Sequence, residues 1–109
     1  MKTLKFIVDG QKVTLHPDYN ADSLVPGTAG YVQAEFTFSE EWEGCTKVVG
    51  FYSNLGKEYE PRELKDGKVC EIPAEALKKS IFKLKVFGQK TGYNIKTNKL
   101  AIHQKGGKA

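Results

Sequence analysis

A strict alternation of apolar and polar residues between Val32 and Phe38 constrains this chain more than any other feature. Such a period of two is typical of a β-strand with one buried face. A short acidic corner with the single tryptophan, Trp42, comes next, and Thr46 to Phe51 is a second run rich in β-branched and aromatic residues. We therefore expect two strands joined by a tryptophan-bearing corner at the centre of a small β domain.

Short segments of this kind, separated by turn residues, recur along the chain. Asp9-Gly10 and Asp66-Gly67 predict two hairpins, the first with a type I′ turn. Pro61 places the segment around it at a sheet edge, because proline cannot donate to a ladder. The expected strands are Thr3 to Val8, Gln11 to Leu15, Tyr31 to Phe38, Thr46 to Tyr52, Lys57 to Arg62, Lys68 to Ile72, Ile81 to Phe87, Tyr93 to Ile95 and Lys99 to His103.

One segment, Pro73 to Lys79, indicates a helix, since it begins with proline, continues with good helix formers and ends in lysines. We expect roughly two turns that cross between two sheets. Loops are expected at Asp18 to Gly30, which is long enough for a binding surface, and at Gly88 to Gly92. Together these elements predict an all-β fold: an antiparallel immunoglobulin-like β-sandwich with one short helical crossover.

The length of 109 residues suits one domain. We expect a single sandwich over residues 1–103 and a flexible tail over residues 104–109, which are polar and contain a Gly-Gly pair. The inward positions of the predicted strands define the core, and Trp42 is expected to close one of its ends. The expected core residues are Trp42, Phe36, Phe38, Phe51, Phe82, Leu84 and Val86.

Charge is distributed unevenly along the chain. Residues 1–55 hold four lysines and seven acids, whereas residues 56–109 hold thirteen basic residues and six acids. The last part, from Lys78 onward, has nine lysines and no acid. This asymmetry is compatible with an acidic partner, or with a solvated strand face whose lysines protect sheet edges. The single arginine, Arg62, argues against nucleic acid as the partner.

Outward positions on the predicted strands give a candidate interface. Tyr31 and Tyr52 fall on outward faces by alternation, and such tyrosines either cover a sheet, contact a protein or stack on a sugar. The candidate interface residues are Tyr31, Tyr52, Lys83, Lys85, Lys96 and Lys99.

No motif for catalysis, a cofactor or a metal is apparent. His16 and His103 lie far apart in the sequence, and neither has a partner at metal-ligand spacing. Cys45 and Cys70 match no zinc or redox spacing, so two buried free thiols are expected, with a disulfide as the alternative. The glutamates beside Trp42 lack the alternating oxygens of a calcium loop. The sequence therefore predicts a protein that is not an enzyme and has no cofactor.

Neither a signal peptide nor a membrane span is expected. The apolar part of the N-terminus is short and is interrupted by Lys5, and no apolar run approaches the roughly 20 residues that cross a bilayer. These features predict synthesis in the cytoplasm and no contact with a membrane.

The run from Phe36 to Gly44, with Lys47 and Phe51 after it, resembles a motif of small proteins from tailed bacteriophages and prophages of Firmicutes, Phe-x-Phe-(Ser/Asp)-x-x-Trp-x-Gly. The similarity continues through Cys70 to Leu77 and covers roughly residues 30–103. The resemblance implies a virion component: a tail or baseplate β-sandwich module, or a capsid decoration protein. It carries over no catalytic residues.

On this basis we expect a non-enzymatic bacteriophage structural protein that forms a homo-oligomer, docks on other virion proteins and is assembled in the host cytoplasm. Two alternatives stay open. One is a carbohydrate-binding module for host attachment that contacts a cell-wall glycan. The other is an intracellular phage effector that binds nucleic acid or a host defence protein through its lysine-rich C-terminal region.

Overall fold

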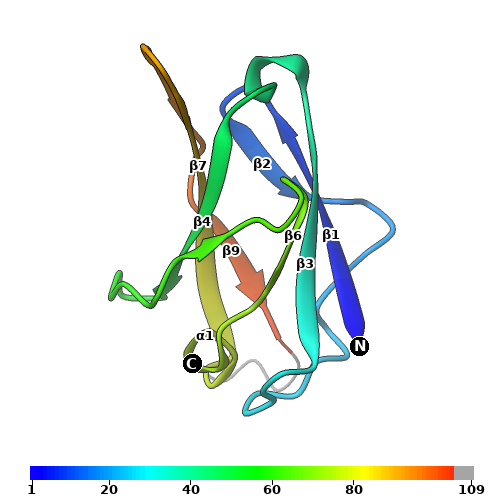
Figure 1. Ribbon diagram of the computed structural model, residues 1–109. Helices are drawn as coiled ribbons and strands as arrows, with labels where there is room; N and C mark the ends of the chain where they lie inside the picture. The colour runs from blue at the N-terminus through cyan, green and yellow to red at the C-terminus, as the bar shows by residue number, and fades with distance from the viewer. Residues whose placement is uncertain (105–109) are drawn as a thin grey trace.

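The computed structural model describes residues 1–104, which fold as two β-sheets packed face to face (Figure 1). The all-β sandwich predicted from the sequence is confirmed. Gln104, which we had placed in the tail, belongs to the folded part: it is 3% exposed, and its side-chain amide donates hydrogen bonds to the carbonyls of Leu77 and Lys79. The other tail residues, 105–109, lie outside the described part of the chain.

Sheet A has the strand order β2-β1-β3-β6. Its β1 and β3 run parallel, with Lys2 opposite Val32 and Val8 opposite Phe38, which departs from the antiparallel prediction. The reason is that β2 lies at the sheet edge, and the following loop carries the chain past β1 to start β3 at the same end. The strands are β1 (Lys2–Asp9), β2 (Lys12–Leu15), β3 (Val32–Phe38) and β6 (Val69–Glu71).

Sheet B has the order β5-β4-β7-β8, and β9 also pairs with β7. All its pairs are antiparallel. The long β4–β7 ladder, from Thr46 opposite Gln89 to Ser53 opposite Phe82, forms its centre. The strands are β4 (Thr46–Ser53), β5 (Arg62–Glu63), β7 (Ile81–Lys90), β8 (Tyr93–Lys96) and β9 (Leu100–His103).

Both predicted hairpins form, but their turns differ. Asp9 pairs with Lys12, so Gly10 and Gln11 occupy the turn, and of these only Gly10 has a positive φ, of 57°. The type I′ prediction is therefore wrong for this hairpin, which has the single positive φ of a type II′ turn. In the second hairpin Asp66 and Gly67 both have positive φ, 55° and 67°, as a type I′ turn requires.

Two predicted strand limits are wrong. In the segment Lys57 to Arg62, regular pairing with β4 begins only at Arg62, and before it Glu58 forms only an isolated bridge with Tyr52. The segment Gly88 to Gly92 is not a loop, since β7 continues to Lys90 and Gly88 pairs with Ile95. The turn is reduced to the two residues between β7 and β8.

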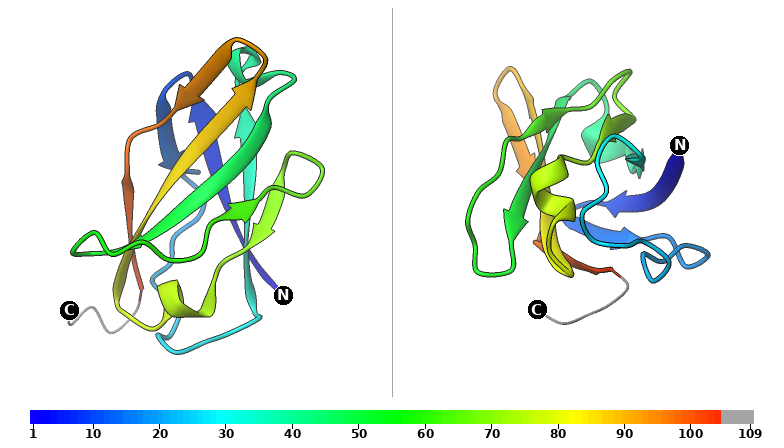
Figure 2. Two further views of the ribbon diagram at one scale, coloured as in Figure 1. Left: turned by 60° about the vertical axis from the view of Figure 1, so that its left-hand side comes forward. Right: turned by 90° about the horizontal axis from the view of Figure 1, so that it is seen from below.

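The predicted helix crosses from sheet A to sheet B, as expected, but it is a single turn, α1 (Ala74–Leu77) (Figure 2). After this turn the Lys78 N–H bonds the Glu75 carbonyl, three residues back, so the α-helical pattern does not continue. The Leu77 carbonyl accepts hydrogen bonds from the Gly27 N–H at 2.8 Å and from the Gln104 side chain at 3.1 Å. The end of α1 is therefore joined to the long loop and to the residue that follows β9.

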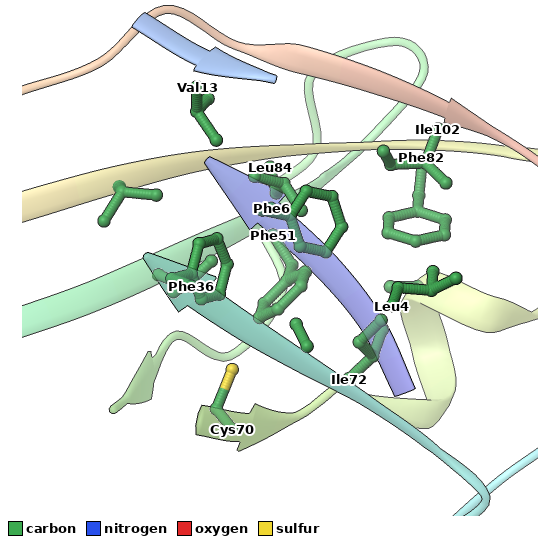
Figure 3. Close-up of a cluster of buried hydrophobic side chains, with 14 of the residues drawn as sticks. Leu4, Phe6, Val13, Phe36, Phe51, Cys70, Ile72, Phe82, Leu84 and Ile102 are labelled. Carbon is green, nitrogen blue, oxygen red and sulfur yellow. The ribbon is translucent and has the colours of Figure 1, made fainter. Parts of the chain in front are cut away.

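The core lies between the sheets and is built by alternate residues of both (Figure 3). Phe6 and Phe36 of sheet A stack with ring centroids 5.0 Å apart, and Phe51 and Phe82 of sheet B contact at 6.5 Å. Six of the seven predicted core residues are at most 2% exposed: Trp42, Phe36, Phe51, Phe82, Leu84 and Val86. The seventh, Phe38, is only half-buried, because it lies at the end of β3 beneath the Lys47 ammonium.

Trp42, in the 3-10 turn η1 (Glu40–Trp42), closes one end of the sandwich as predicted. Its indole N–H donates to the Gly10 carbonyl at 2.7 Å, and its ring contacts Phe38 at 5.2 Å. The Ser39 hydroxyl does not cap this turn and instead accepts the Gly10 N–H at 2.9 Å. The corner is therefore joined to the β1–β2 turn.

The opposite end is closed by the long loop between β2 and β3 together with α1. Ala21 and Leu24 of the loop are buried in the core. This part of the loop, which we had considered as a binding surface, therefore has a structural role.

Candidate docking surface

The outer face of sheet B brings together five of the six candidate interface residues. On β4 the outward positions are Val48, Gly50 and Tyr52, opposite Phe87, Lys85 and Lys83 of β7. On the other side of β7, Lys96 of β8 lies opposite Phe87. Lys99 precedes β9, whose first residue pairs with Leu84, so it lies beside Lys85. We call Tyr52, Lys83, Lys85, Phe87, Lys96 and Lys99 the lysine face.

Tyr31, the sixth candidate, lies elsewhere. It is 52% exposed and immediately precedes β3 in sheet A, where its carbonyl accepts a hydrogen bond from the Lys2 N–H. The structure thus separates it from the lysine face.

Tyr52 points outward as predicted but is only 7% exposed, and the hydroxyl end of its ring lies over Gly50. The space for the ring comes from Gly50. A Cβ atom at Gly50 would be 2.7 Å from the Tyr52 hydroxyl oxygen and 3.1 Å from the Phe87 ring. A glycine in a strand often marks such a close approach. Burial, and then the charge of Glu58, raises the pKa of Tyr52.

Two lysines of this face lie over aromatic rings. The Lys99 Nζ atom is 4.2 Å from the centre of the Tyr52 ring, and the Lys85 Nζ atom is 5.4 Å from the centre of the Phe87 ring. Such ammonium–ring contacts are favourable and restrict where a flexible lysine places its charge. The lysine face therefore presents ammonium groups above the rings of Tyr52 and Phe87.

None of the four lysines of this face forms an ion pair within residues 1–104. The ion pairs of that region join Lys5 to Glu35 and Arg62 to Glu60, and the His16–Asp18 contact at 4.0 Å is an ion pair only when the histidine is protonated. The acids on the outer side of sheet B, Glu58 and Glu63, lie along its β5 edge. The part of the face over β7 to β9 is therefore positively charged without internal compensation.

The outer face of sheet A is chemically different. Lys5 and Glu35 lie opposite each other on β1 and β3, and their charged atoms are 4.0 Å apart. Beside them the Gln33 amide donates to the Thr3 hydroxyl at 3.0 Å. On this sheet Lys5, Glu35, Gln33 and Thr3 therefore have partners on the same face.

Shallow hollows adjoin the lysine face. One of about 260 Å³ lies beside Tyr52 and is lined by Val48, Tyr59 and Pro61 among others. A second, of about 360 Å³, lies beside Phe87, where the rim includes the side chains of Gln89 and Asn94. Because of these hollows, the surface around the lysine face is uneven.

Phe87 and Gly50 were not predicted from the sequence to contribute to this surface. Phe87 was treated as the last residue of its strand, although its odd-numbered position places it with Lys83 and Lys85. Gly50 was not singled out. Its position between two inward residues and two before Tyr52 was the available signal.

Both cysteines are free and buried, in line with the first of the two sequence interpretations. Burial raises the pKa of the Cys70 thiol to about 12, so the thiol stays protonated at neutral pH. The protonated thiol is a poor nucleophile. His16 and His103 lie apart, on the segment after β2 and on the exposed side of β9.

At the acidic corner Glu40, Glu41 and Glu43 are all exposed. A hydrogen bond from the Ser39 side chain lowers the pKa of Glu41. Across residues 1–104, no group of three or more His, Cys, Asp or Glu side chains is placed to hold a metal ion. No helix in this region is long and apolar enough to cross a membrane.

No protein-family model matches the chain, and neither a curated protein nor a solved structure matches it. The candidate surface therefore rests on the geometry of the chain itself, and the resemblance to phage proteins stays a prediction from the residues around Trp42.

Proposed function

We propose that this chain is a non-enzymatic docking protein whose lysine face binds an acidic surface on another protein. The observation that carries the proposal is the set of four lysines over β7 to β9 that form no ion pair within residues 1–104 and lie beside Tyr52 and Phe87. Complementary charge steers association and fixes the orientation of docking, while aromatic residues supply contact area.

The proposal places the protein in the virion of a tailed phage, as a tail, baseplate or capsid decoration component assembled in the host cytoplasm. This part is supported by the resemblance of the Phe36 to Gly44 segment. In such a particle many copies are displayed together, so a modest contact per copy is sufficient for stable attachment.

The first experiment measures binding to poly-L-glutamate by calorimetry. One variant carries Lys83→Gln, Lys85→Gln, Lys96→Gln and Lys99→Gln. The matched control changes four exposed lysines outside this face to Gln, so both variants lose four positive charges: Lys12, Lys65, Lys68 and Lys78. We expect the face variant to lose most of its affinity and the control to lose much less. Equal losses would overturn the docking surface.

The second experiment determines the copy number of the protein in purified particles of the encoding phage by quantitative mass spectrometry. We expect the protein in wild-type particles, fewer copies for the face variant and an unchanged number for the control variant. Particles without the wild-type protein would contradict the virion role.

A second candidate function is glycan binding, which is favoured by the hollow beside Phe87, because an aromatic ring flanked by the amides of Gln89 and Asn94 suits a sugar. Trp42 is fully buried and Tyr52 is covered, so neither offers a free stacking surface. Saturable binding of cell-wall oligosaccharides that Phe87→Ala removes would favour this function over protein docking.

Nucleic acid is the remaining alternative partner. Single-stranded DNA binding that is tighter than poly-L-glutamate binding, with a steep salt dependence, would replace the acidic protein by nucleic acid.

A further inference from the structure

Lys99 reaches across a neighbouring strand to make its aromatic contact. It directly precedes β9, whose first residue pairs with Leu84 of β7, whereas Tyr52 belongs to β4 on the opposite side of β7. Adjacent strands are about 4.8 Å apart, so the side chain must extend over β7 to bring its ammonium group 4.2 Å from the Tyr52 ring.

The path of Lys99 brings its ammonium group over the strand positions that face Lys83 and Lys85. Tyr52 lies opposite Lys83, and Gly50, under the Tyr52 ring, lies opposite Lys85. The Lys99 ammonium therefore sits over the part of the sheet that these two lysines flank. Like charges repel, and a lysine that is free to move would turn away into solvent. The attraction between the Lys99 ammonium group and the Tyr52 ring opposes this repulsion and keeps the ammonium group over the ring.

This position of the Tyr52 ring depends on glycine at position 50. A Cβ there would come within 2.7 Å of the Tyr52 hydroxyl oxygen and 3.1 Å of the Phe87 ring, so the Tyr52 ring would have to tilt away from the sheet. The Lys99 ammonium group would then lose its contact with the Tyr52 ring.

We propose that Tyr52, lying across Gly50, is a positioning residue that holds Lys99 between Lys83 and Lys85 and so creates a preformed site for the carboxylates of an acidic protein segment. This inference rests on the proposed docking function and names the part of the lysine face that recognises acidic side chains. Holding the charges in place before binding lowers the entropy that the complex must lose. Lys83 and Lys85 bind the carboxylates together with Lys99, and Tyr52 acts through Lys99.

The test compares Tyr52→Phe, which keeps the ring, with Tyr52→Leu, which removes its π face. We expect Tyr52→Phe to bind poly-L-glutamate like the wild type and Tyr52→Leu to bind about two- to fivefold more weakly, the range of an ammonium–ring contact at an exposed site. The affinity of Tyr52→Leu should also fall less steeply with salt, because one charge fewer is held at the site.

A second measurement follows the Lys99 side chain without any ligand. In the wild type and in Tyr52→Phe, the ring current should shift the Lys99 methylene protons next to the ammonium group upfield in NMR spectra. Tyr52→Leu and Gly50→Ala should remove or reduce this shift. An unshifted Lys99 resonance in the wild type would overturn the inference.

The outcomes distinguish this inference from the proposed function. If the four-lysine face variant loses binding while Tyr52→Leu binds like the wild type, the docking surface stands and the positioning role of Tyr52 is wrong. If the face variant binds no differently from its matched control, the docking surface itself is wrong. Unfolding curves of Tyr52→Phe and Tyr52→Leu identify any loss that comes from the fold.

Discussion

Two aromatic rings lie on glycines of sheet B, one on each side of the sheet. Inside, the Trp42 indole covers Gly88, where a Cβ would be 2.7 Å from its ring carbons. Outside, Tyr52 covers Gly50, where a Cβ would be 2.7 Å from its hydroxyl oxygen. In both places a strand glycine lets an aromatic ring approach the backbone. The two rings differ in their roles.

The difference lies in what surrounds each ring. Trp42 is fully buried, packs against Phe38 and donates its N–H to Gly10, so it has no direction in which to move. Tyr52 lies on the outer face of the sheet, 7% exposed, with the ammonium group of Lys99 4.2 Å from the centre of its ring. The same glycine-and-ring arrangement therefore contributes to stability in the core and to charge placement on the surface.

The comparison predicts its largest effect for Trp42→Ala, which should lower the free energy of unfolding by about 3–5 kcal/mol, since a fully buried ring is replaced by a cavity. Tyr52→Ala is the matched change on the outer side and should cost less, because solvent can fill the space. Urea unfolding of both variants gives the measurement. A Tyr52→Ala cost as large as that of Trp42→Ala would remove the distinction between the two rings.

Gly88→Ala should have the next largest effect, a loss of about 1–3 kcal/mol, because the new methyl group overpacks against an indole that cannot move. The same change in a Trp42→Ala background should cost far less, since the methyl group then has space. A double-mutant cycle measures this coupling. Additive costs would show that Gly88 is needed for some reason other than Trp42.

Gly50→Ala should change stability by less than about 1 kcal/mol. The Tyr52 ring can tilt into solvent, and replacing a strand glycine by alanine brings back a gain of roughly 0.5–1 kcal/mol in backbone entropy. The effect should appear instead as weaker poly-L-glutamate binding. A destabilisation that equals that of Gly88→Ala would mean that Tyr52 is as confined as Trp42.

The smallest expected effect is on pH dependence. The raised pKa of Tyr52 means that the folded state holds the phenol proton more tightly than the unfolded chain does. This contribution to stability is fully present below the ordinary value of 10.0 and is lost as pH rises through the folded pKa. Urea unfolding from pH 9 to 11 should therefore show a shallower loss for Tyr52→Phe than for the wild type. The same dependence of stability on pH in Tyr52→Phe and in the wild type would contradict this prediction.

Much of the scaffold could be predicted because its signals are local. The alternation in Val32 to Phe38 and in Ile81 to Phe87 gave the strands and the buried side of each. Asp66-Gly67 gave a hairpin with both residues in its turn, whereas the same pair at Asp9-Gly10 gave a hairpin with a different turn. Proline and lysines around α1 gave the crossover, although the helix is shorter than expected and its last carbonyl bonds the distant Gly27 and Gln104.

The features that were missed depend on distant partners. Gly88 looked like a loop residue because nothing nearby in the sequence reveals that Trp42, far along the chain, will lie on it. Tyr52 was placed on the correct face but its burial was not foreseen, since this follows from Gly50, Phe87 and Lys99 on three different segments.

The sequence by itself determined the all-β class, the inward and outward sides of most strands and the excess of lysine after residue 77, since a strand's period and its charge are properties of neighbouring residues. The tertiary structure decided that four of those lysines share one face, that Tyr52 lies beneath one of them, and that β1 and β3 run parallel. These features depend on which strands become neighbours, and strand pairing is set by packing over the whole chain.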